Sequence, residues 1–208
     1  MFQRFRAAFP TDGGRNGEPL DASLRRLPGL AELATECSGV TFGGGLLAVH
    51  SQASASRASR LIADAFPDFP GAYQALAQDW LGRQFAVGVT PGTSYAQQIL
   101  LFEPGSGEAF EVDADIPRLF NVEFVSDPTT YLAADLFADW IRAGGRLGWP
   151  DGCVGFKVPL FLGGEGVVEN LEPVDLEVYW SLLGQMRSKT KDLTPGSKIS
   201  EVTIDQPK

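Results

Sequence analysis

Hydrophobic residues recur at helical spacing near both ends of the chain and at alternate positions in its middle. Near the N-terminus, the spacing of Phe2, Phe5 and Phe9 predicts a short helix that ends before Pro10. Similar spacing predicts helices over about residues 58–66, 128–141 and 175–186, and a helical stripe over 20–37 that a proline interrupts. The segments LLAVH (46–50), QFAVGV (84–89), QILLF (98–102) and AFEVD (109–113) predict strands.

The predicted strands in the middle of the chain are separated by the turn motifs TPGTS and EPGSG, so we expect them to pair as an antiparallel meander. Helices come before and after this meander, which predicts an α+β fold in which an antiparallel β-meander is flanked by helices. In the strand 109–113, Phe110 and Val112 are expected to face inward, and Glu111 and Asp113 outward. The segment KISEVTI (198–204) predicts a last edge strand.

The two C-terminal helices are predicted to pack through apolar stripes. Asp127-Pro128 and Asp175 are expected at their N-termini, because Asp accepts bonds from backbone N–H groups and Pro fits the first helical turn. The stripes consist of Leu132, Leu136, Phe137, Trp140 and Ile141 in one helix and of Leu176, Tyr179, Trp180, Leu183 and Met186 in the other. We therefore expect the aromatic residues of both helices to lie in the core.

Charge is distributed unevenly along the chain. Residues 31–186 contain twenty acidic and seven basic residues, whereas both ends carry a small excess of basic residues. A body this acidic should repel nucleic acid, and its charge suits either a basic partner or simple solubility. Apolar runs fall short of the ~20 residues that span a bilayer, and no signal-peptide pattern is present. We expect a cytoplasmic protein that binds neither nucleic acid nor membranes.

Candidate chemistry is sparse. The stretch GGEGVVE (163–169) lacks the third glycine of a dinucleotide-binding fingerprint, and the chain contains no GxxxxGK[ST], GxSxG or HExxH motif. His50 is the single histidine and closes a strand, so we expect it to be a hydrogen-bonding residue rather than a catalytic base. Cys37 and Cys153 are far apart, which predicts free, buried thiols. We predict no catalytic residue and no cofactor.

Acidic residues follow the glycine turn in a cluster: Glu165, Glu169, Glu172, Asp175 and Glu177. Carboxylates of this kind can hold a hard cation, but the cluster lacks the spacing of a calcium loop, and Pro173 interrupts any face that all five would share. Asp175 and Glu177 instead suit the start of a helix, where negative charge is stabilised. We expect no metal site here; structural or solvated roles are favoured over contact with a partner.

The stretch QDWLGRQFAV places Asp79, Trp80 and Arg83 at a tight turn between two strands. One interpretation is an ion pair between Asp79 and Arg83 that closes the hairpin. The other is an exposed Trp/Arg anchor of the kind that dominates protein interfaces. The residues favour the first interpretation without excluding the second.

Three motifs in order then resemble a known family. They are DWLGRQFAV, LLFEPGSGEAFEV and CVGFKVPLFLGGEGVVENLEPVDLEVYWSLLGQM. Together they resemble the type VI secretion immunity proteins of the Tdi type, in which a GAD-like N-terminal region precedes an immunity domain similar to SMI1/KNR4 (SUKH) proteins. The resemblance places the GAD-like region at residues 1–70, packed on the rest, and the immunity domain at 71–208, and we expect the two to form one compact unit.

The resemblance implies a non-enzymatic antitoxin in the cytoplasm that binds a cognate effector toxin, typically a DNase. The alternative from the residues alone is a small hydrolase that uses a pair of carboxylates. Because the helical stripes are assigned to the core, the charged residues expected outside are Asp79 and Arg83 in the turn and Glu108, Glu111, Asp113 and Asp115 along a strand edge. We predict that these residues bind the toxin. The oligomeric state is left open.

Overall fold

The structure, a computed structural model, describes residues 1–21, 27–69, 71–92 and 96–193. The α-helices are α1 (Gln3–Ala8), α2 (Leu30–Glu36), α3 (Gln52–Ala65), α4 (Ile116–Arg118), α5 (Phe124–Ser126), α6 (Pro128–Leu132), α7 (Ala134–Arg142) and α8 (Leu176–Thr190). The strands are β1 (Thr41–Phe42), β2 (Leu47–Val49), β3 (Tyr73–Asp79), β4 (Gln84–Gly88), β5 (Ile99–Glu103), β6 (Glu108–Val112), β7 (Gly152–Phe156) and β8 (Leu171–Asp175). A π-helical turn (Leu119–Glu123) joins α4 to α5, and two short 3₁₀ turns (Leu160–Leu162 and Val168–Asn170) precede β8.

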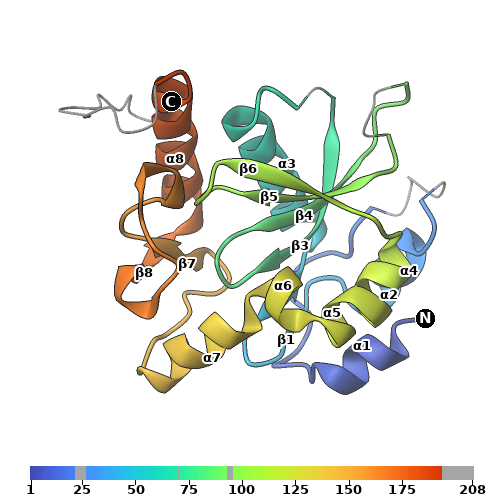
Figure 1. The fold of residues 1–208 in the computed structure, drawn as a ribbon. Helices are drawn as coiled ribbons and strands as arrows, with labels where there is room; N and C mark the ends of the chain where they lie inside the picture. Colours follow the sequence, from blue (N-terminus) through green and yellow to red (C-terminus); the bar gives the residue numbers. More distant parts are fainter. Residues whose placement is uncertain (22–26, 70, 93–95, 194–208) are drawn as a thin grey trace.

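Six strands form one antiparallel sheet in the order β1-β2-β3-β4-β5-β6, and β7 pairs with β8 in a separate hairpin (Figure 1). Each strand of the large sheet lies beside its neighbour in sequence, which confirms the predicted meander and the α+β class. Strands β1 and β2 come from the first 70 residues and join the sheet through β3, where Leu47 pairs with Asp79. The predicted domain boundary at residue 70 falls between α3 and β3, and it stays a prediction.

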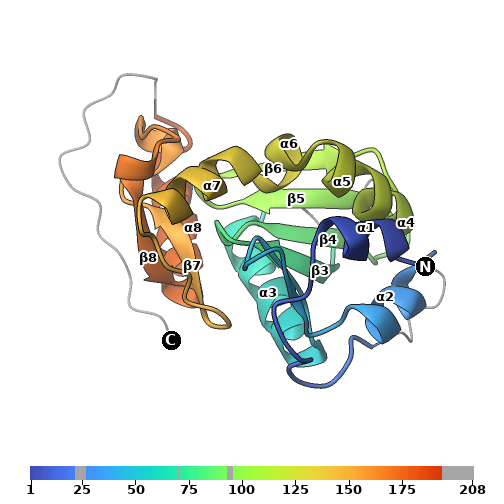
Figure 2. The same cartoon turned by 90° about the horizontal axis from the view of Figure 1, so that it is seen from below.

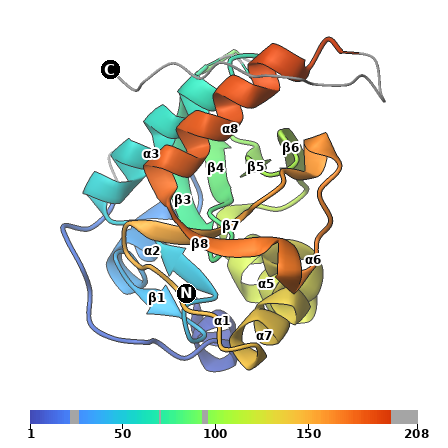
Figure 3. The same ribbon diagram turned by 90° about the vertical axis from the view of Figure 1, so that its left-hand side faces the viewer.

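The sheet is covered on both faces. Figure 3 shows α3 and α8 side by side on one face, with α1 and α5–α7 on the other, and Figure 2 shows α7 leading toward the β7–β8 hairpin. In β5, Leu100 and Phe102 belong to the core under α3 and α8, whereas Ile99 and Leu101 belong to the core of the opposite face. Successive side chains of a strand point to opposite faces, so a sheet covered twice needs apolar residues at nearly every position.

The predicted helix starts are confirmed. The Asp127 carboxylate accepts a bond from Thr130 N (3.1 Å) at the start of α6, and the Asp175 carboxylate accepts one from Val178 N (2.9 Å) at the start of α8. The predicted helix over 128–141 is divided at Ala133, whose left-handed backbone (φ 50°) separates α6 from α7. Within α7, Trp140 is buried, but Ile141 lies about 100° further around the helix and is 44 % exposed, so its predicted core position is wrong.

The aromatic residues of α8 are buried as predicted, with Trp180 fully enclosed and Tyr179 at 5 % exposure. In β6, by contrast, Phe110 is 42 % exposed, and the prediction that it faces the core is wrong. The reason is that β6 is the edge strand of the sheet, so Phe110 has a neighbouring strand on one side only. The predicted strand 198–204 lies outside the described residues. Within the described part of the chain, no helix is long and apolar enough to cross a membrane.

Candidate functional site

The turn between β3 and β4 holds a buried ion pair. The Nε atom of Arg83 donates to Asp79 Oδ2 at 2.6 Å, and Asp79 Oδ1 also accepts from the backbone N–H groups of Leu81 and Arg83. Arg83 further donates to the Tyr131 carbonyl at 3.0 Å, which connects the turn to α6. Burial raises the pKa of the Asp79 carboxyl to about 6, against the opposing effect of Arg83. The predicted pairing of Asp79 with Arg83 is confirmed.

The predicted exposure of this pair is wrong, since Asp79 has 0 % and Arg83 7 % of its surface exposed. Trp80 between them is also fully buried, which excludes the exposed-anchor interpretation. Its backbone N–H donates to Leu46 O (3.1 Å) and its indole Nε1 to Leu132 O (3.0 Å), so segments from two distant parts of the chain cover the turn. A hairpin sequence shows which residues pair across the turn but not what is packed on top of it.

Three of the predicted contact residues, Glu111, Asp113 and Asp115, lie together and exposed where β6 leads into α4; we call them the acidic edge. They border a shallow depression that Gln97, Gln98 and Arg118 also line. The Asp115 carboxylate accepts a bond from Arg118 N (2.9 Å), so it caps α4 as well. The acidic edge is therefore an exposed, negatively charged surface, and one of its three carboxylates, that of Asp115, also forms a hydrogen bond within the protein.

Glu108 is exposed too, but it lies at the opposite end of β6, where it pairs with Glu103 across the strands. The structure thus brings together three of the six predicted residues, places Glu108 apart from them, and encloses Asp79 and Arg83. Charged residues on an edge strand also have a protective role, since they discourage pairing with a strand of another molecule. The acidic edge is consistent with that role and with contact to a basic partner.

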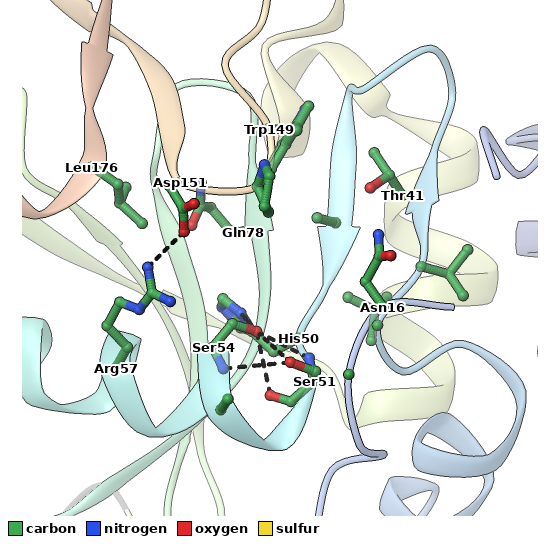
Figure 4. Close-up of a pocket in the computed structure, with 17 residues that line it drawn as sticks. Asn16, Thr41, His50, Ser51, Ser54, Arg57, Gln78, Trp149, Asp151 and Leu176 are labelled. Carbon is green, nitrogen blue, oxygen red and sulfur yellow. Dashed lines mark hydrogen bonds and ion pairs between the residues drawn. The ribbon is translucent and has the colours of Figure 1, made fainter. Parts of the chain in front are cut away.

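A pocket of about 220 Å³, which the sequence did not reveal, lies between the start of α3, strands β2 and β3, and the loop before β7 (Figure 4). At one side the Arg57 guanidinium pairs with Asp151 at 2.8 Å (Figure 4). Trp149 closes another side, and its indole Nε1 donates to Gly45 O at 3.0 Å. Because Arg57 and Asp151 are far apart in the sequence, no local pattern indicates that they meet.

The single histidine and the two cysteines of the chain are buried in this fold. Burial lowers the pKa of His50 to about 4, and raises the pKa of the Cys37 thiol to about 11 and that of Cys153 above its ordinary value. Both cysteines are free and buried, as predicted. Among the described residues, no three His, Cys, Asp or Glu side chains are grouped in a way that could hold a metal ion.

Comparison with known proteins identifies the C-terminal part of the chain. Residues 122–187 match the family described as "T6SS immunity protein Tdi1, C-terminal". This segment begins in the π-helical turn and runs through α8, and it includes the β7–β8 hairpin and the acidic cluster after the glycine turn. Over this segment the chain is similar to the C-terminal domain of a type VI secretion immunity protein, which confirms the predicted resemblance. The similarity to SMI1/KNR4 (SUKH) proteins stays a prediction.

A solved structure shares the fold over most of the chain. The crystal structure of Atu4351 from Agrobacterium tumefaciens superposes with a TM-score of 0.62 over 89 % of this chain and 89 % of that one. The two sequences are 15 % identical, so the likeness concerns the fold alone. No curated protein matches this sequence.

Proposed function

We propose that this protein is an immunity protein that binds a cognate secreted effector toxin in the cytoplasm and so protects the producing cell and its sisters. The observation that carries the proposal is the match of residues 122–187 to the Tdi1 immunity family. We further propose that the protein acts by binding and not by catalysis. The neutral, hydrogen-bonded His50 and the buried thiols support this, because none of them is available as a base or nucleophile.

We propose that the toxin is a basic nuclease that acts on DNA. A nuclease needs Lys and Arg to hold phosphate, and an acidic protein can compete for that surface. The region 31–186 carries a large excess of acidic residues. Three of them, the residues of the acidic edge, are exposed to solvent. We assign the toxin contact to the acidic edge, with Glu108 as a peripheral contributor. The buried pair Asp79–Arg83 lies at the other end of the sheet, where Arg83 is 3.8 Å from Glu103, so it does not belong to this surface.

The test is co-expression with the toxin encoded beside this gene, followed by measurement of association with the purified toxin. Wild-type protein should keep the cells alive. The double reversal Glu111→Lys and Asp113→Lys should fold normally and slow association at least ~10-fold, about 1.4 kcal/mol of steering and contact energy. The matched control is Asp64→Lys with Asp192→Lys, which makes the same change in net charge at exposed positions away from the acidic edge.

The outcomes separate the two parts of the proposal. If wild-type protein fails to protect cells from the toxin, the immunity function is wrong. If it protects, but the double reversal and the control both associate at the wild-type rate, the interface lies elsewhere. The acids of the 165–177 segment would then be the next surface to change. If both variants are slowed equally, net charge matters and the location of the acidic edge does not.

A further inference from the structure

Strand β6 forms an uncovered edge of the large sheet. It is the last strand in the sheet order, and among the described residues no strand or isolated bridge pairs with its outer side. Phe110 in this strand is 42 % exposed, and Glu108 and Glu111 are exposed as well. The backbone of an edge strand presents a row of unpaired N–H and C=O groups, which can pair with a strand of another molecule.

The register of β4, β5 and β6 shows which backbone groups of β6 are unpaired. Gly88 N donates to Gln98 O at 3.0 Å, in register with the pairs that join β4 to β5. Alternate residues of a strand bond to opposite neighbours, so the even-numbered residues of β5 bond to β4 and its odd-numbered residues bond to β6. The β6 partners of these odd-numbered residues are Glu108, Phe110 and Val112. Ala109 and Glu111 therefore direct their N–H and C=O groups away from the sheet.

The usual protections of a sheet edge are missing from β6. Such edges are commonly blocked by very short strands, Pro, Lys, a bulge or a covering segment. The opposite edge strand, β1, has two residues and is bridged by Thr11, and β8 contains Pro173. Strand β6 contains neither Lys nor Pro, and its pairing with β5 continues without a register shift. Negative charge is thus the main restriction on a strand that pairs here.

The carboxylates of β6 lie on both faces of the sheet edge. Glu111 is opposite Leu100, on the face covered by α3 and α8. Phe110 is opposite Leu101 on the other face, and Glu108 shares that face because side chains alternate along a strand. Opposite charges on neighbouring strands stabilise a sheet, and like charges destabilise it. A second copy of β6 would bring further carboxylates to this edge, whereas a strand that carries Lys or Arg would be attracted on either face.

We propose that β6 binds an extended segment of a basic partner by strand addition. The backbone groups of Ala109 and Glu111 would pair with the main chain of the partner, and Lys or Arg side chains of the partner would face Glu108 and Glu111. The inference rests on the proposed function in taking the toxin as this partner, and it states how the acidic edge holds the toxin. It differs from attraction between charges alone, because strand addition requires the outward N–H groups of two particular residues.

Hydrogen exchange of single amides, followed by NMR on the full chain, tests the proposal. In the free protein the N–H groups of Ala109 and Glu111 should exchange fast, and the purified toxin should slow their exchange at least ~10-fold. The variant Ala109→Pro removes one outward N–H without changing the charge or a bond to β5, and edge strands tolerate Pro at such positions. It should weaken toxin binding roughly 3- to 10-fold. The matched control Ala109→Val keeps the N–H and should bind like wild type.

The possible results separate this inference from the immunity function. If the toxin binds but both amides still exchange fast, or if a folded Ala109→Pro variant binds the toxin as tightly as Ala109→Val, strand addition is wrong and the immunity function stands. Slow exchange of both amides in the free protein would also overturn strand addition, because the edge would already be covered.

If the toxin does not bind the wild type, the proposed function is wrong, and a short peptide of alternating lysine and valine residues then decides the inference. Slower exchange of the Ala109 and Glu111 amides with this peptide, and not with its counterpart of glutamate and valine, would support a site for a basic strand. Unchanged exchange with the lysine peptide would reject it.

Discussion

His50 shows how a titratable side chain is made inert by its surroundings. Both ring nitrogens are hydrogen-bonded, the residue is 5 % exposed, and desolvation lowers the pKa of the ring to about 4. The residue was predicted to form hydrogen bonds because a lone histidine at the end of a strand offers no partner for catalysis. Its connection to Gln84 and Gln78 was not predictable, because that contact depends on the register of three strands.

This low pKa makes a prediction about stability. A histidine whose pKa falls from its ordinary value of 6.5 to about 4 on folding stabilises the protein above pH 6.5, and this stabilisation is lost as the pH falls toward 4. Between pH 7 and pH 4.5 the wild type should lose about 2 kcal/mol of unfolding free energy through this residue. The variant His50→Gln cannot titrate and should lose that much less, as measured by urea unfolding at both pH values.

Asp79 titrates in the same range with the opposite sign, because its pKa is raised to about 6 and its contribution to stability falls as the pH rises from about 4 to 6. Both proteins contain Asp79, so the difference between them isolates His50. Equal pH dependence in the wild type and the variant would show that His50 does not remain neutral in the folded state.

At the scale of elements, patterns within one segment were predictable and contacts between segments were not. Strands β2, β4, β5 and β6, their meander order and the Asp caps of α6 and α8 follow from local periodicity and turn chemistry, whereas β1 and the β7–β8 hairpin were not predicted. The break at Ala133 has no local signal, since alanine rarely adopts a left-handed backbone, and the exposure of Phe110 follows from the edge position of β6. The depth of Asp79 and Arg83 likewise depends on β2 and α6, which come from elsewhere in the chain.

The pair Asp79–Arg83 connects the β3–β4 turn to α6 through the Tyr131 carbonyl, so we expect its loss to destabilise the fold. Arg83→Met would leave the Asp79 carboxylate buried without its cation and should cost about 3–5 kcal/mol of unfolding free energy. The control is Arg142→Met, which removes an exposed pair with Asp139 in α7 and should cost less than ~1 kcal/mol. Chemical denaturation measures both.

Adding Asp79→Asn to the Arg83→Met variant should recover part of the loss. The amide has no charge to bury, and its oxygen can still accept from Leu81 N and from the backbone N–H of residue 83. If Arg83→Met is no more destabilising than Arg142→Met, the buried pair contributes little and the turn is held by backbone contacts alone.

At the scale of the whole molecule, the first and last parts of the chain are packed on one central sheet. Strands β1 and β2 extend it, α3 covers one face together with α8, and α1 helps to cover the other. The family match begins only at residue 122, so the sheet itself belongs to the part of the chain that the match does not cover. Of the three motifs that carried the resemblance, only the last lies inside the matched segment. The pocket at the junction with the N-terminal part became visible only in the folded chain.

The overall charge gives the last prediction. The chain carries a formal net charge of −9, and its acidic residues are concentrated in the folded middle of the sequence. If the toxin is basic, this field accelerates encounter, and salt should weaken the effect because the Debye length falls from ~30 Å at 0.01 M to ~8 Å at 0.15 M ionic strength. The association rate should therefore fall steeply over this range while the dissociation rate changes little, as measured by stopped-flow mixing.

The double reversal Glu111→Lys and Asp113→Lys should flatten the salt dependence more than Asp64→Lys with Asp192→Lys, because charges close to the interface act most strongly on encounter. A wild-type association rate that is constant across this range would show that the acidic surface serves solubility and does not steer the toxin.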